Sequence, residues 1–593
     1  MSYRQSEYSA TKQRGLVQRA SLAFAGVGGT ILLLGLGAQT TAAADYSSPQ
    51  VSQLSSIGAR YGAQPATALR YPVPPGAYFV SPSGSNSGSG RQSSPWRTVA
   101  KAVSSAPSGS TIVLRAGTYH ESVTWYRKTL TLQPYPGERA VFDGSVPVTG
   151  WVADSSTLWH VDGWKTTFKQ GGRPDLVYNN SLAAYPDMVF RDGIPLRQVG
   201  SLSQVVADSF YVDRANERLY VGSSPTGRAM AASTLSRALY LNYAQNSMVR
   251  GITFQRYATH PDLVAAVLGT GKGLFFENNI FRHNAAIGLS DMSDDSTITN
   301  NTFAYNGQMG LHSHETDNVV IRENWMHHNN TERFKLPGAQ GGLKVTAGSN
   351  HLWVDNLSEQ NYGCGLWLDR RSHDVTIARN VVRDNSFRGI KAEVSARVII
   401  ASNLVLRNKT YGILDNESNG VRIWNNTLVL NGRGIQATDS SRRSSDTTFP
   451  KDVKAMAIRN NIIVDANAVW PKPPALLAIE DFTRTRTGSQ MGVTADYNAY
   501  YRTGTAPQTL VMWARSGGTS LFADLAKFRR RTGQEVHGLG FNRTPAPFVD
   551  PAAGNYRVRL GSPPALAGKP LPPDIAAAIG VPSGVPVDMG ILQ

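Results

Sequence analysis

Residues 356–393 read NLSEQNYGCGLWLDRRSHDVTIARNVVRDNSFRGIKAE and contain the repeating unit that decides the fold. Each unit has an Asn, a second Asn five residues later, and then a Gly followed by an aliphatic residue. The anchoring glycines of successive units are 22, 32, 23, 24, 23 and 22 residues apart. A period in this range with short alternating runs indicates a solenoid, in which equivalent positions stack on one another. The anchoring glycines are Gly288, Gly310, Gly342, Gly365, Gly389, Gly412 and Gly434.

Two asparagine columns run through the repeat without a gap. Asn tolerates left-handed backbone at turns, and stacked amides can form a hydrogen-bonded ladder. Leucine-rich and helical repeats are excluded, because the units lack fixed leucines and 3.6-residue periodicity. The pattern predicts an all-β chain, a right-handed parallel β-helix of the pectin-lyase type, with about three short strands in each coil and coils about 4.8 Å apart. The columns are Asn279, Asn301, Asn324, Asn356, Asn380, Asn403 and Asn426, and Asn284, Asn306, Asn329, Asn361, Asn385, Asn408 and Asn431.

The rest of the chain is organised around this solenoid. Proline at its first turn and apolar residues on one face predict a short helix over Pro95–Ala106, which would cover the open end of the solenoid. A second helix is predicted over Ser520–Arg531, and the 32-residue spacing predicts a projecting loop over Thr331–Gln340. The expected segments are a signal peptide (1–44), a Ser/Pro/Ala-rich linker (45–76), an N-terminal cap with the first coils (77–148), a nested β subdomain (149–235), the main β-helix (236–500) and a C-terminal wrap (501–593).

The N-terminus has the pattern of a secretion signal. Arg14 and Arg19 precede an apolar stretch, Ser21–Ala38, that ends in small residues. A charged region, a hydrophobic region and an A-x-A-like site predict export, with cleavage after Ala44. The alternative is an uncleaved membrane anchor, since the apolar run approaches the length that spans a bilayer.

Charge and cysteine content limit the partners and the chemistry. The formal net charge is +17, and residues 1–44 account for +3, so +14 remains after cleavage. Such a balance indicates either an acidic partner, such as a uronate polysaccharide or an anionic cell wall, or solubility alone. The chain contains one cysteine, Cys364, so it forms no intrachain disulfide. We interpret Cys364 as a small buried packing residue rather than a nucleophile.

Three successive coils carry the residues that indicate chemistry. Counted from the anchoring Gly, positions +2 and +4 face outward by strand alternation. Position +4 holds Asp369 and Glu393 on adjacent coils, and we expect their carboxyls to lie on an exposed face, about 5 Å apart, the separation of a retaining glycosidase. Mutual repulsion would raise the pKa of one of them. Position +2 holds Lys344, Trp367 and Lys391, and Trp367 offers a flat surface for a sugar ring.

Several alternatives remain open. The acidic pair and the lysines could form a surface ion-pair ladder, and the lysines could either bind an acidic sugar or neutralise the carboxylates. His312 and His314 occupy the equivalent +2 and +4 positions one coil earlier, where we expect substrate contacts. With His327 and His328 they could instead hold a metal ion, but no ligand spacing favours this.

The segment Gly365-Leu-Trp-Leu-Asp369, followed by Ile390-Lys-Ala-Glu393-Val-Ser395, resembles the active-site coils of glycoside hydrolase family 120, the β-xylosidase type of β-helix enzyme. The resemblance implies that Asp369 is the nucleophile and Glu393 the acid/base. It also implies a second aromatic residue after the nucleophile, where this chain has Arg370 and Arg371, and an uncharged residue where it has Lys391. These departures concern xyloside specificity more than the chemistry.

The sequence therefore predicts a secreted carbohydrate-active enzyme. We expect a retaining glycoside hydrolase acting on a plant or microbial polysaccharide or oligosaccharide, xyloside-like and possibly acidic, with Lys344, Lys391 and Arg370 as substrate contacts. The first alternative is a polysaccharide lyase or uronate C5-epimerase, in which Lys344 or Lys391 abstracts the C5 proton. The second is a non-catalytic glycan- or cell-wall-binding solenoid. A hydrolase needs no cofactor, whereas the lyase alternative leaves room for a structural or catalytic calcium ion; no nucleic-acid partner is expected.

Overall fold

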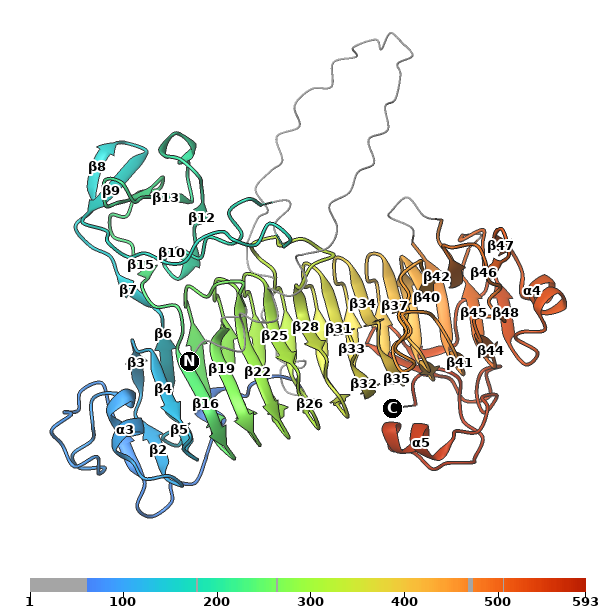
Figure 1. The fold of residues 1–593 in the computed structure, drawn as a ribbon, viewed down its shortest axis with the longest axis horizontal. Helices are drawn as coiled ribbons and strands as arrows, with labels where there is room; N and C mark the ends of the chain where they lie inside the picture. Colours follow the sequence, from blue (N-terminus) through green and yellow to red (C-terminus); the bar gives the residue numbers. More distant parts are fainter. Residues whose placement is uncertain (1–60, 177–179, 263–264, 468–472, 505, 593) are drawn as a thin grey trace, which may run out of the picture. The chain divides into compact units, whose positions relative to one another are not determined.

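The computed structural model describes residues 61–176, 180–262, 265–467, 473–504 and 506–592. These residues form a right-handed parallel β-helix, as the repeat predicts (Figure 1). Three long sheets run along it, each with 13 strands among the described residues. The predicted signal peptide and most of the predicted linker lie outside the described residues. Within them, no helix is long and apolar enough to cross a membrane.

Each coil contributes one strand to each sheet in turn. Sheet 1 contains β1 (Tyr78–Val80), β2 (Thr111–Leu114), β5 (Thr131–Pro134), β17 (Met248–Arg250), β20 (Phe275–Glu277), β23 (Thr297–Thr299), β26 (Val320–Arg322), β29 (Leu352–Val354), β32 (His373–Ala378), β35 (Ala396–Ala401), β38 (Arg422–Trp424), β41 (Ala457–Arg459) and β44 (Thr494–Asp496). Sheet 2 contains β3 (Gly117–Tyr119), β6 (Ala140–Asp143), β18 (Ile252–Gln255), β21 (Ile280–Arg282), β24 (Thr302–Ala304), β27 (Trp325–His327), β30 (Leu357–Glu359), β33 (Val381–Arg383), β36 (Leu404–Leu406), β39 (Thr427–Asn431), β42 (Ile462–Ala466), β45 (Ala499–Arg502) and β48 (Leu539–Asn542).

Sheet 3 has the longest strands and carries the residues that the sequence singles out. It contains β4 (Val123–Tyr126), β16 (Leu239–Gln245), β19 (Ala265–Lys272), β22 (Ile287–Asp294), β25 (Met309–His314), β28 (Gly341–Thr346), β31 (Cys364–Asp369), β34 (Arg388–Glu393), β37 (Tyr411–Asn416), β40 (Arg433–Asp439), β43 (Leu477–Asp481), β46 (Val511–Arg515) and β47 (Gly518–Phe522). Its strands are parallel except for the hairpin β46–β47.

Both asparagine columns form continuous ladders. In each, the side-chain amide of one Asn donates to the carbonyl oxygen of the next Asn, at 2.9–3.0 Å through the predicted residues. The first column continues through Asn461 and Asn498, two coils beyond the prediction. Because every amide also caps a backbone carbonyl inside the coil, the ladders fix the register that the spacing predicts.

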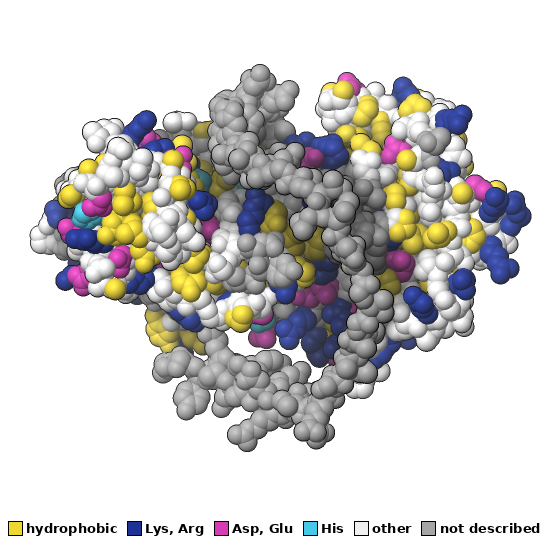
Figure 2. All heavy atoms as spheres, turned by 90° about the horizontal axis from the view of Figure 1, so that it is seen from above, with side chains coloured by type: hydrophobic (Ala, Val, Ile, Leu, Met, Phe, Trp, Pro, Cys, Tyr) yellow, Lys and Arg dark blue, Asp and Glu magenta, His cyan; other side chains and the backbone are white. Residues whose placement is uncertain are grey.

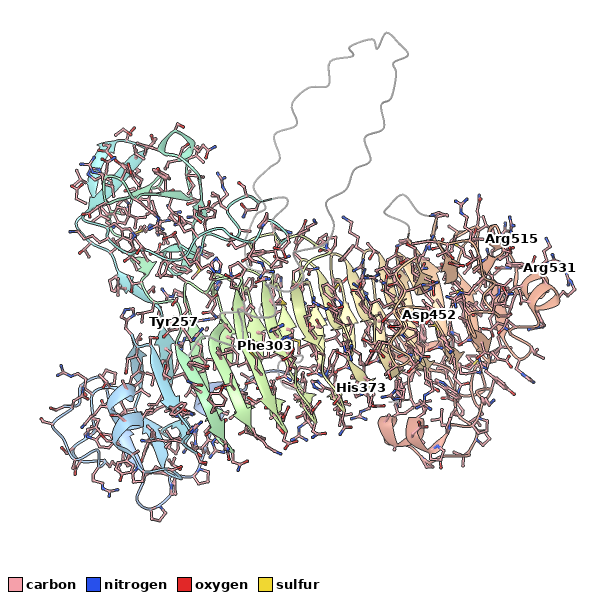
Figure 3. All side chains as sticks on the ribbon, in the orientation of Figure 1. Tyr257, Phe303, His373, Asp452, Arg515 and Arg531 are labelled. Carbon is pink, nitrogen blue, oxygen red and sulfur yellow. The ribbon has the colours of Figure 1, made fainter. Side chains whose placement is uncertain are left out.

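Apolar side chains fill the interior of the coils. Phe254, Phe281 and Phe303 stack from coil to coil, with ring centroids 5.3 and 5.0 Å apart. Tyr257 and Phe303, both labelled in Figure 3, are fully buried. This core is continuous from the N-terminal helix to the last coils, so each strand of sheet 3 has a fixed inner face.

Short helices close the two ends. Helix α3 (Val99–Ser105) packs Val99 and Val103 into the core, and it begins later than predicted because the Thr98 hydroxyl caps it. Helix α4 (Leu525–Thr532) buries Leu525 and Phe528. It also begins later than predicted, because residues 518–522 pair with β46 as strand β47. The chain then returns along the outside, where α5 (Pro573–Ile579) packs against Ala401 and Trp424.

The nested subdomain consists of two small sheets. One contains β7 (Ser145–Pro147), β10 (Val189–Arg191), β11 (Ile194–Pro195) and β15 (Met230–Ser233); the other contains β8 (Val152–Ser155), β9 (Leu158–Asp162), β12 (Arg197–Gln198), β13 (Ser209–Asp213) and β14 (Arg218–Val221). The predicted loop at 331–340 contacts this subdomain, because Phe334 is buried against Leu176 and Ala184. The remaining elements are the hairpin β49 (Phe548–Asp550) and β50 (Asn555–Val558) and the 3₁₀ turns Ala66–Ala68 and Leu202–Gln204.

Candidate functional site

The register of sheet 3 places the two candidate carboxylates at equivalent positions on adjacent strands. Lys344, Trp367 and Lys391 are paired across β28, β31 and β34, and Thr346 pairs with Asp369. The Arg370 amide then donates to the Glu393 carbonyl at 3.0 Å, which continues the same register past Asp369. The neighbouring inward side chains, Leu368 and Ala392, are fully buried in the core. Asp369 and Glu393 therefore follow each other along the outer side of the sheet, one coil apart.

The prediction that Trp367 is exposed is wrong. Trp367 is 2% exposed, because the ammonium groups of Lys344 and Lys391 lie 3.8 and 4.0 Å from the centre of its ring. An indole ring attracts cations through its electron-rich face, so the two lysines of the same column cover it. In this state Trp367 presents no open surface to a sugar ring, and its role as a platform would require the lysine tips to move aside.

Asp369 forms an ion pair with Lys344 of the preceding coil. Its Oδ2 lies 2.8 Å from Nζ of Lys344, and both side chains are about one-tenth exposed. The carboxylate is thus not on an open face either, contrary to the prediction. Both charges are largely removed from solvent, so each is stabilised by its partner instead of by water, and this fixes the orientation of the two side chains.

Glu393 pairs with two cations. Oε2 accepts from Nζ of Lys391 on the same strand, and Oε1 lies 3.1 Å from Nη2 of Arg442. Burial raises the pKa of this carboxyl, but Lys391 and Arg442 outweigh burial, so the pKa of Glu393 lies below its usual value. The rise in pKa that repulsion was expected to cause in one of the two carboxyls is thus not found at Glu393, because Lys391 and Arg442 offset the negative charge there.

Lys391 is a buried base whose pKa is lowered. Its side chain is 5% exposed, and burial lowers its pKa to about 8, with help from the charge of Arg388 and against the pull of Glu393. A lysine in this state is partly neutral near pH 8 and can then accept a proton. The same burial that removes it from solvent therefore gives it the properties of a base.

The other predicted contacts lie around this group. Arg370 is exposed at the turn after β31. His312 and His314 stack at 6.0 Å on β25, one coil before Lys344. Burial, with smaller effects of His314 and Lys344, lowers the pKa of His312 to about 3, so this ring is neutral. His327 belongs to β27 in sheet 2, so the structure does not bring the four histidines into one site; its described residues contain no cluster of three or more His, Cys, Asp or Glu that could hold a metal ion.

Arg442 is a contact that the sequence did not predict. It lies in the segment that follows β40, outside every repeat column, and it bridges Glu393 to Glu417 of the next coil. Arg371 contacts the same segment through Asp446, at 3.1 Å. The adjacent Arg442-Arg443 in the long insertion between coils is a weak signal that could have indicated it. Figure 2 shows basic and acidic side chains lying beside one another in the middle of the molecule.

Three family models match parts of the chain. Residues 265–428 match "Right handed beta helix region", residues 179–340 match "Periplasmic copper-binding protein (NosD)", and residues 82–125 match "Protein of unknown function (DUF1565)". Each covers less than a third of the chain. The first model agrees with the observed coils, and the second spans part of the nested subdomain and the first coils after it.

Known proteins are similar in fold rather than in sequence. XylC in complex with xylose superposes with a TM-score of 0.59 at 16% identity, over 80% of this chain and 87% of that chain. The A-module of the mannuronan C-5 epimerase AlgE4 of Azotobacter vinelandii gives a TM-score of 0.35 at 12% identity, over 68% and 87% of the two chains. The uncharacterized protein YwoF of Bacillus subtilis (strain 168) is 37% identical over 71 residues, which is 11% of this chain and 15% of that protein. The likeness to XylC shows the β-helix fold.

Proposed function

We propose that this chain is a retaining glycoside hydrolase, with Asp369 as the nucleophile and Glu393 as the acid/base. One observation carries the proposal: the two carboxylates occupy equivalent outward positions on adjacent parallel strands. Neighbouring strands lie about 4.8 Å apart, and a retaining mechanism uses carboxyls about 5 Å apart. The fold shared with XylC supports a glycan substrate.

The charges around the pair support this division of roles. Lys344 holds Asp369 as an oriented carboxylate, which is the form that attacks the anomeric carbon. Lys391 and Arg442 hold Glu393 ionised without substrate, which is the form that activates water in the second step. In the first step Glu393 must carry a proton. Arg442 is about half exposed, so a sugar that enters here displaces it, and the pKa of Glu393 rises.

Variants of the two carboxylates test this proposal. Asp369→Asn stops formation of the glycosyl-enzyme on every substrate. Glu393→Gln spares the first step for aryl glycosides with good leaving groups, and added azide restores turnover because it replaces the activated water. Arg407→Gln, on an exposed ion pair of sheet 2 with Asp384, is the matched control and keeps normal activity. If both carboxylate variants keep full activity on every substrate that the parent chain hydrolyses, the hydrolase proposal is excluded.

A second function is favoured by one specific observation. The buried Lys391, whose pKa lies near 8, is suited to abstract the C5 proton of a uronate, as a lyase or C5-epimerase requires. Asp369 and Glu393 would then serve the substrate carboxylate or a cation. Product analysis separates the two: a lyase leaves an unsaturated uronide that absorbs in the near ultraviolet, whereas a hydrolase does not. Lys391→Ala abolishes activity outright only in the lyase or epimerase.

A non-catalytic glycan-binding solenoid remains the alternative if no turnover is found on any glycan. We also propose that the chain is exported and that its mature form starts at Asp45, on the charged and apolar pattern of residues 1–44. N-terminal sequencing of exported material tests this. A mature chain that still contains Leu32–Leu34 would be membrane-anchored instead.

A further inference from the structure

Arg388 lies at the start of β34, the strand that ends with Glu393. It pairs in register with Tyr411 on the following coil. Arg388 stands three residues before Lys391 on this strand, and after burial its charge is the next influence that lowers the pKa of Lys391. The same column continues through Tyr411 to Arg433. The Arg433 guanidinium reaches Gln436 and Glu480, which lie at outward positions of their strands. This column therefore opens on the same outer side of sheet 3 as the carboxylate pair, toward the beginning of the strands.

The guanidinium of Arg388 has hydrogen-bond donors that nothing satisfies. Its Nε and Nη1 are enclosed by protein, and neither has an acceptor among the residues that the structure describes. The group lies against the ring of Phe387, 3.9 Å from its centre, so it is held in one place. Buried charged donors without a partner are rare in folded proteins, and each one calls for an explanation.

The carboxylates near Arg388 already form ion pairs with other residues. Asp369 pairs with Lys344, Glu393 pairs with Lys391 and Arg442, and Glu480 pairs with Arg433 at 2.7 Å. Two further donors on this side of the sheet also lack an acceptor within the described part of the chain: Nε1 of Trp367 and Nη2 of Arg433. This region therefore has more hydrogen-bond donors than the protein's own acceptors satisfy, and an anionic ligand would supply what is missing.

We propose that Arg388 binds the carboxylate of a hexuronate sugar in the subsite beside the Asp369–Glu393 pair. Nη2 of Arg388 is not among the enclosed atoms and has no hydrogen-bond partner in the described part of the chain. It shares one edge of the planar guanidinium with Nε, and such an edge can give two parallel hydrogen bonds to a carboxylate, which an ammonium group cannot. Phe387 keeps the fork in place before the sugar arrives, so little side-chain freedom is lost on binding. The proposal rests on the proposed function for the location of the subsite, and it adds the class of sugar that the subsite accepts.

Binding of matched sugars tests the proposal without requiring turnover. The probes are methyl β-glucuronide against methyl β-glucoside and the corresponding galacto pair, which differ only at C6. We expect the mature chain to bind one uronide at least tenfold more tightly than its neutral partner. Arg388→Gln should remove this preference while leaving the affinity for the neutral glycoside unchanged. Arg322→Gln, an exposed arginine of β26 in sheet 1, is the control and should retain the preference.

Three outcomes would overturn the proposal. One is equal affinity for uronides and neutral glycosides in the parent chain. Another is an unchanged preference in Arg388→Gln. The third is equally tight binding of galactose 6-sulfate, which would mean that the site accepts any anion rather than a carboxylate. Asp369→Asn separates this test from the proposed function: it should keep the uronide preference while losing hydrolysis. A chain that shows the preference but hydrolyses nothing would contradict the hydrolase and support the subsite.

Discussion

Lys344 Nζ lies 2.8 Å from Oδ2 of Asp369, although the two residues belong to successive coils of the β-helix. The same ammonium lies 3.8 Å from the centre of the Trp367 ring. One lysine thus orients the proposed nucleophile and covers the tryptophan beside it. Because both charges are largely enclosed, removing one of them would leave the other buried without a partner, which is costly.

Removing Lys344 should destabilise the fold through Asp369. We expect Lys344→Met to lower the free energy of unfolding by about 3 kcal/mol, because the substitution keeps the packing on Trp367 but leaves an enclosed carboxylate alone. Adding Asp369→Asn should recover most of the loss. Denaturant titrations of the two single variants and the double variant give the coupling energy. The exposed Lys409→Met should change stability by less than about 0.5 kcal/mol; additive single effects would contradict the pairing.

Replacing a single side-chain amide in an asparagine ladder should destabilise the fold. Asn356 is fully buried and donates to Asn380 and to the carbonyls of Ile321 and Val354. Asn356→Asp places a carboxylate among these oxygens, and we expect a loss of roughly 3 kcal/mol or more. The same change at the exposed Asn350 should cost less than about 1 kcal/mol. Thermal unfolding of the two variants under the same conditions makes the comparison, and similar losses would refute a structural role for the ladder.

The spacing of Gly and Asn was enough to predict the coils, their register and the adjacency of Asp369 and Glu393. The reason is physical: in a parallel solenoid the period alone decides which residues are neighbours, and the buried amides allow no slippage. The nested subdomain could be located by the break in the repeat, but not described, because its strands pair antiparallel without any period.

The surroundings of the site were harder to predict. Strand alternation correctly pointed Trp367 outward but says nothing about neighbouring side chains, and two lysines in its own column cover it. The order of residues in that column, with Trp367 between Lys344 and Lys391, could have predicted the cation–π contacts. Arg442 could not be placed, because it comes from an insertion whose path is set by tertiary contacts rather than by the repeat.

Asp415 should make stability depend on pH. It points into the core, where burial raises its pKa to about 8. The folded chain therefore keeps a proton that the unfolded chain releases near pH 4, so this residue lowers stability as the pH rises from about 4 to 8. Asp415→Asn should remove that dependence. The stability of the variant relative to the parent should therefore increase across this range, by roughly 5 kcal/mol for a pKa raised from 3.8 to about 8. Denaturant titrations at several pH values measure it.

Asp374 is the matched control for Asp415. The Arg397 guanidinium beside it lowers the pKa of Asp374 to about 2, which is the opposite direction. Its contribution is present above pH 4 and is lost as the pH falls toward 2. Asp374→Asn should therefore show no change relative to the parent between pH 4 and 8. If Asp415→Asn also shows no change relative to the parent between pH 4 and 8, the prediction is wrong: Asp415 is then ionised in the folded chain, and other groups stabilise its buried charge.

Arg442 should set the pH range of the proposed hydrolysis. It lowers the pKa of Glu393 together with Lys391, so Arg442→Gln should raise that pKa. The first step needs protonated Glu393, and its protonated form would then persist to higher pH. The alkaline limb of kcat/KM for the free enzyme should therefore move upward, while Arg442→Lys, which keeps the charge, should move it less. Arg443→Gln is the control, since Arg443 pairs with Asp439 instead. An alkaline limb that stays in place in Arg442→Gln while moving in Lys391→Met would assign the control of Glu393 to the lysine alone.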